Sequence, residues 1–69
     1  MVDERAHLAQ ADRHIARAKT NIAKQEQLIV GLAVNGRQVR DAESFLSVLM
    51  TTLNAFETHR RAILLRLEK

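Results

Sequence analysis

One break, Asn35-Gly36, interrupts a chain of 69 residues that otherwise carries almost no signal to end a helix. The chain has no Pro and two Gly, and 46% of its residues are apolar. Gly, and after it Asn, tolerates the left-handed backbone conformation that closes many helices. The sequence therefore predicts a single domain over residues 1–69, with helices at about 3–34 and 38–68 and a turn at 35–37.

Apolar residues recur with heptad spacing on both sides of this break, which is typical of a coiled coil. The first series is Leu8, Ala11, Ile15, Ala18, Ile22, Gln25, Ile29 and Leu32. The second series is Val39, Ala42, Leu46, Leu49, Leu53, Phe56, Arg60, Ile63 and Leu67. Each helix thus has one apolar stripe, and a short turn must pack the two stripes together. The predicted fold is all-α, a two-helix antiparallel hairpin.

A single register joins the two stripes over their whole length. It pairs Leu8 with Ile63 and Ile15 with Phe56, and it continues in the same way to the turn. The fact that one register suits every layer supports the hairpin more strongly than any single pair does.

Further apolar residues lie outside the stripes. They include Ala9, Ala16, Ala23, Val30, Phe45, Val48, Met50, Leu64 and Leu65. Two rods that touch along one stripe bury little surface, and a chain without Cys has no disulfide to stabilise it. We therefore expect self-association, with a homodimer forming an antiparallel four-helix bundle. The sequence leaves open a higher oligomer and which flank forms the interface.

Two polar residues occupy stripe positions. Arg60 lies opposite the small Ala11, with Asp12 and Glu57 as its expected acceptors, and Gln25 lies opposite Leu46. Polar layers in an apolar seam often fix register and partner orientation at some cost in stability. An anion site made of Arg60, His59 and His14 is the functional alternative.

The register sets His14 beside His59 and His7 beside Arg66. Facing imidazoles can bind a metal ion, but a zinc site needs three or four ligands, and Arg60 and Arg61 oppose a cation. We expect partly exposed side chains rather than a metal site, and no cofactor.

A basic stripe on the outer face of the first helix contains Arg13, Arg17 and Lys24, in a chain of net charge +3. Such a stripe could follow phosphates along a nucleic acid, although a solvated face of mixed charge explains it without further assumptions and is the favoured interpretation. The plasmid copy-number protein Rop, an RNA-binding four-helix bundle, is an analogy of architecture only.

Catalysis is not expected, because a thin bundle without Cys, Tyr or a Gly-rich loop lacks the concave site that chemistry needs. No segment approaches the roughly 20 apolar residues of a membrane span, and the first ten residues do not form a secretory signal. We expect a cytoplasmic protein with no membrane contact.

The segments DRHIARAKTNIAKQEQLI and ETHRRAILLRL, with the Asn-Gly turn between them, resemble a group of short uncharacterised proteins of α-proteobacteria. The shared features map onto Arg13, His14, Ile15, Ile22, Gln25, Leu28, Ile29, Gly36, His59, Arg60, Leu64 and Leu67. The family often places Asp and Thr after the glycine, where this chain has Gln38 and Val39. The resemblance implies a bacterial helical hairpin and transfers no activity.

The sequence thus favours a structural or interaction module that self-associates and offers helix faces to itself or to an unidentified protein partner. The alternative is a small basic bundle that binds RNA or DNA.

Overall fold

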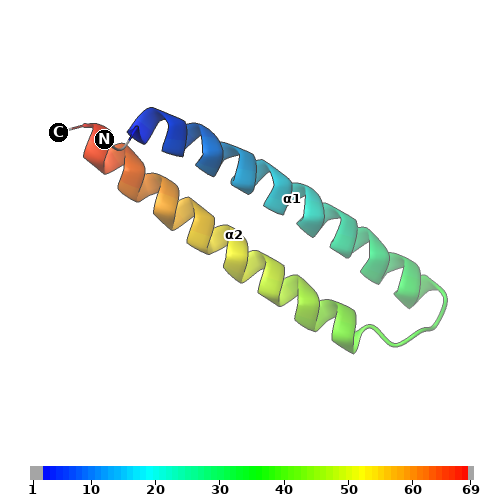
Figure 1. Ribbon diagram of the computed structural model, residues 1–69. Coiled ribbons are helices and arrows are strands. Elements are labelled where there is room, and N and C mark those ends of the chain that lie inside the picture. The colour runs from blue at the N-terminus through cyan, green and yellow to red at the C-terminus, as the bar shows by residue number, and fades with distance from the viewer. Residues whose placement is uncertain (1–2, 69) are drawn as a thin grey trace.

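The computed structural model describes residues 3–68, so residues 1, 2 and 69 of the expected domain lie outside the described residues. Two helices, α1 (Glu4–Val34) and α2 (Arg40–Leu67), run antiparallel, and both ends of the chain lie at the same end of the rod (Figure 1). The molecule measures 53 × 16 × 14 Å. The prediction of an all-α antiparallel hairpin is confirmed.

The start of α1 is capped by Asp3. Its Oδ1 accepts hydrogen bonds from the backbone N–H groups of Arg5 at 3.1 Å and Ala6 at 3.3 Å. These are donors that the first turn of a helix leaves without a partner, so Asp3 stabilises the helix start.

The end of α1 is closed by Gly36, which has φ +69°. The Gly36 N–H donates to the Ala33 carbonyl at 3.0 Å, and the Arg37 N–H donates to the Leu32 carbonyl at 2.8 Å. This pair of bonds is a Schellman motif, in which a residue with positive φ turns the chain away from the helix axis.

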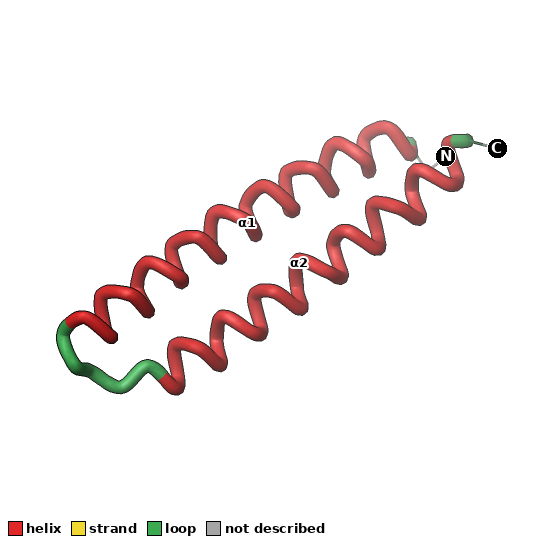
Figure 2. The backbone as a smooth tube through the Cα atoms, turned by 180° about the vertical axis from the view of Figure 1, so that it is seen from behind, coloured by secondary structure: helices red, strands yellow, loops and turns green. Residues whose placement is uncertain are grey.

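The connection runs through residues 35–39, two residues longer than the predicted turn (Figure 2). The second helix begins at Arg40 with Val39 as its cap, and Val39 makes no side-chain capping bond. The predicted start at Gln38 is therefore two residues early. Asp41 and Glu43 lie in the first turn, where their charge complements the helix dipole.

The core is the line along which the two heptad stripes meet. Ala11, Ala18 and Ile63 are buried, and the other stripe residues are half-buried, with one exception. That exception is Leu67, which is 39% exposed because it lies in the last turn of α2. The interior is one side chain thick along the whole rod.

Neither helix, within residues 3–68, has a stretch long and apolar enough to cross a membrane.

Candidate functional site

The polar layer of the seam joins Arg60 to Asp12. The Arg60 Nε–H donates to Asp12 Oδ1 at 2.6 Å, and both side chains are more than a third exposed. Glu57, the other expected acceptor, lines the same surface depression as Arg60, but the ion pairs formed within the described residues do not include it. Because water screens the Arg60–Asp12 pair, it contributes at most about 1 kcal/mol, so its main effect is on register.

Gln25 also bonds across the hairpin. Its Nε2 donates to the Ala42 carbonyl at 2.9 Å in a partly buried position. The predicted neighbour, Leu46, lies one helical turn further along α2 and offers no side-chain acceptor, so the amide reaches a backbone oxygen instead.

The three histidines lie around one depression of about 550 Å³ near the chain ends. Its lining residues are Glu4, His7, Gln10, Ala11, His14, Phe56, His59 and Arg66. The ring of His14 stacks on Phe56, with ring centroids 5.2 Å apart and an interplanar angle of 24°. The structure therefore brings His14 and His59 to the same hollow, with Phe56 as the stacking partner of His14.

A metal or anion site is not assembled there. Within residues 3–68, no group of three or more His, Asp or Glu side chains is placed to hold a metal ion. The anion site considered for Arg60, His59 and His14 is also absent from the described residues. Arg60 lines a different depression and is bound to Asp12, whereas the two histidines line the hollow that contains Phe56.

Glu4 forms an ion-pair cluster that the sequence analysis missed. The Arg66 Nε–H donates to Glu4 Oε2 at 2.9 Å, and His7 Nδ1 lies 3.9 Å from Glu4 Oε1. The expected pairing of His7 with Arg66 is thus replaced by a shared carboxylate. Extending the heptad stripe back from Ala11 by seven residues would have placed Glu4 in the seam beside the Arg66–Leu67 end of α2.

The basic stripe of α1 is exposed at Arg13, Arg17 and Lys24. Within residues 3–68, none of the three takes part in an ion pair. Their charges therefore face solvent.

Several large apolar side chains outside the seam are more than half exposed. They are Leu28, Val30, Val34, Phe45, Val48, Met50 and Leu65. The small residues Ala9, Ala16 and Ala23 are also exposed, whereas Leu64 is half-buried against the hairpin. Most of the residues expected at an interface thus remain uncovered in the single chain.

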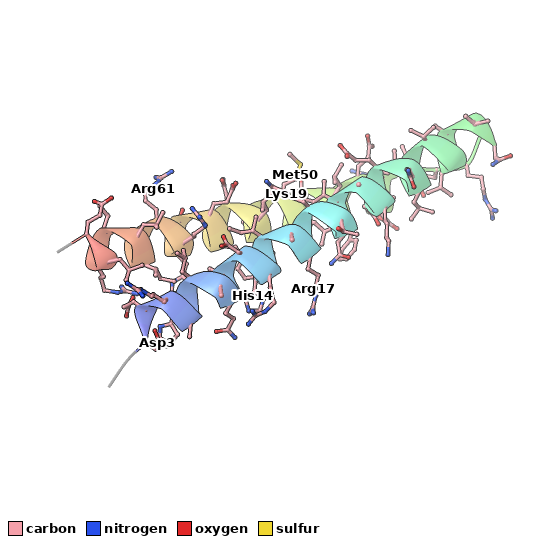
Figure 3. All side chains as sticks on the ribbon, turned by 90° about the horizontal axis from the view of Figure 1, so that it is seen from above. Asp3, His14, Arg17, Lys19, Met50 and Arg61 are labelled. Carbon is pink, nitrogen blue, oxygen red and sulfur yellow. The ribbon has the colours of Figure 1, made fainter. Side chains whose placement is uncertain are left out.

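The side chains of the two helices project on two opposite sides of the rod. Lys19, Met50 and Arg61 project on one side, and His14 and Arg17 on the opposite side (Figure 3). We call the first the charged side, because the depression there is lined by Asp12, Ile15, Lys19, Glu57, Arg60 and Arg61. The second, which contains His7, His14 and His59, is called the histidine side.

Comparison with protein-family models, with curated proteins and with solved structures finds no match to this chain. The interpretation of its surfaces therefore rests on its own geometry.

Proposed function

We propose that this chain is a non-enzymatic structural and interaction module that works as a self-associated hairpin, a homodimer forming an antiparallel four-helix bundle. The observation that carries the proposal is the large solvent-accessible surface area of the single chain. The chain exposes 5553 Å². A folded monomer of this mass is expected to expose about 4,400 Å².

The exposed surface area in excess of the value expected for a monomer is as large as a typical interface. It is about 1,150 Å² per chain, and a standard protein–protein interface buries about 800 Å² on each partner. The large apolar side chains that are more than half exposed supply the area that association would cover. With no Cys in the sequence, association is the remaining means of burying them.

Thermal unfolding at several protein concentrations tests this proposal. For a folded dimer that dissociates into unfolded chains, the midpoint temperature rises with total protein concentration, because mass action favours the associated state. A midpoint that stays constant over a hundredfold dilution contradicts the proposal.

The second candidate is a nucleic-acid-binding bundle, favoured by the solvent-facing charges of Arg13, Arg17 and Lys24. The measurement is a titration with a generic RNA duplex at low salt. Binding that weakens steeply with salt, and that disappears when the three residues become Glu, would support this function. Replacement of Lys19 and Arg61 on the charged side serves as the matched control.

The proposal includes a bacterial, cytoplasmic protein. This part of the proposal rests on the expected resemblance of the RHI segment, and of HR before the Leu-rich end, to short α-proteobacterial proteins. A protein partner on a free helix face is compatible with the same architecture.

A further inference from the structure

The two sides of the hairpin differ in charge. On the charged side, five of the six residues that line the depression are charged. On the histidine side, a depression of about 270 Å³ is lined by His14, Arg17, Ala18, Asn21, Leu49, Thr52 and Phe56, of which Arg17 alone carries a full charge. The larger depression on the same side has Glu4 and Arg66 among its eight lining residues, and these two charges form an ion pair with each other. Because charged residues are depleted from the centre of protein interfaces, the histidine side is the better surface for a partner.

The turn half of the histidine side carries exposed apolar side chains. Leu28 lies seven residues after Asn21, and Phe45 lies seven residues before Thr52, so both share the face of those residues. Val48 lies one helical turn before Thr52. All three are more than half exposed, and we call them the turn patch.

The other half of the same side is hollow. The depression of about 550 Å³ lies there, with Gln10 on α1 and His59 on α2 among its lining residues, and the apolar residues Ala11 and Phe56 also line it. The histidine side therefore carries exposed apolar side chains at one end and a hollow at the other.

The patch and the hollow lie on opposite sides of the middle of the rod. The midpoint of α1 (Glu4–Val34) is Lys19, with Leu28 nine residues to one side and Gln10 nine residues to the other. In α2 (Arg40–Leu67), Val48 lies eight residues from the start and His59 eight residues from the end. A twofold axis through the middle, perpendicular to the rod, exchanges the positions of the patch and the hollow.

We propose that a second copy of this chain covers the histidine side with its ends reversed, so that the turn patch of each copy enters the hollow of the other. The contact is isologous and closed, as expected for a twofold dimer. It rests on the proposed self-association and adds to it the face and the orientation of the partner.

The reversed orientation of the second copy follows from the need to avoid an empty cavity at the interface. If both turns lay at the same end, hollow would face hollow and enclose a large space, whereas protein interiors are close-packed and empty cavities are destabilising. With the ends reversed, both hollows are filled by side chains that are otherwise exposed.

A matched pair of substitutions tests the face. Phe45 and Met50 are both 54% exposed and lie on α2, Phe45 on the histidine side and Met50 on the charged side. We expect Phe45→Glu to raise the dissociation constant of the dimer at least about a hundredfold, because two buried aromatic rings are lost per dimer. We expect Met50→Glu to change it by no more than about threefold. The constant is measured by sedimentation equilibrium, with helicity followed by circular dichroism.

Equal effects of the two substitutions, or a larger effect of Met50→Glu, would overturn the choice of face while leaving self-association in place. A wild-type chain that is monomeric at all concentrations would overturn the proposed function itself.

A spin label tests the orientation without disturbing the interface. The chain has no Cys, so Arg37→Cys provides one attachment site in the exposed turn. Reversed ends predict a label-to-label distance close to the 53 Å length of the rod, measured by pulsed electron–electron double resonance. A distance below half that length would place both turns together and refute the reversed arrangement.

Discussion

Side-chain hydrogen bonds join the two helices at three positions along the rod. Arg60 binds Asp12, Gln25 binds the Ala42 carbonyl, and Arg66 binds Glu4. Each bond joins α1 to α2, and the three bonds lie in different layers of the seam. A hairpin shifted by one turn would lose all three bonds, so their main contribution is to select the register.

Replacing Arg60 by Leu should make the protein more stable. The small Ala11 is its buried neighbour across the seam, and the Arg60–Asp12 pair is exposed to water, so an apolar side chain gains burial and loses little. We expect a gain of about 1 kcal/mol in the free energy of unfolding, measured by denaturant titration. The exposed neighbour Arg61→Leu should change it by less than about 0.5 kcal/mol. A loss of more than about 1 kcal/mol for Arg60→Leu would show that the ion pair itself stabilises the fold.

The two glycines should respond in opposite ways to Ala. Gly31 lies within α1, and apart from its chain neighbours and the nearby backbone of its own helix no atom lies within 4 Å of an added Cβ, so Gly31→Ala should stabilise the helix by about 1 kcal/mol. Gly36 has equal space but a φ of +69°, so Gly36→Ala should cost about 1 kcal/mol. Thermal melts of both variants provide the comparison. Destabilisation by Gly31→Ala would be inconsistent with an open surface at that position.

At the scale of the helices, the N-termini of α1 and α2 differ in how they are stabilised. α1 begins with a carboxylate that accepts two backbone N–H groups, whereas α2 begins at Val39 with no side-chain cap. The half-buried Val39 belongs to the seam, so its position is set by packing rather than by capping. The start of α2 thus depends on the contact between the helices.

Removal of the Asp3 cap should weaken the hairpin locally. We expect Asp3→Ala to lower the free energy of unfolding by about 1 kcal/mol and to speed amide exchange in the first turn of α1, since two backbone donors lose their acceptor. Asp3→Asn, which retains an acceptor oxygen, is the control and should recover most of the loss. An unchanged exchange rate at Arg5 and Ala6 in Asp3→Ala would speak against the cap.

Heptad spacing and the Asn-Gly break were enough to predict the helices and their antiparallel packing, because both act through local backbone geometry and apolar periodicity. The start of α2 was two residues off, because Val39 offers no capping oxygen to mark it. The Glu4–Arg66 bond was missed because the stripe was not extended back to Glu4. Which side chain sits in the hollow with His14 depends on rotamers, which spacing does not specify; Phe56 turned out to stack on it.

The whole molecule is a rod of 53 × 16 × 14 Å, and among residues 3–68 the buried apolar residues are Ala11, Ala18 and Ile63. A shape of this kind has a large surface for its mass and a thin interior. Its stability should therefore depend on what covers the exposed apolar side chains, and we propose that a second copy of the chain covers them.

Sedimentation equilibrium of the full chain from nanomolar to hundred-micromolar concentration is the decisive measurement. The expected result is a mass that rises with concentration toward twice 7.8 kDa, with helicity lost as the dimer dissociates. A single species of 7.8 kDa that keeps its full helicity at the lowest concentration would contradict the proposal that the hairpin needs a second copy to remain folded.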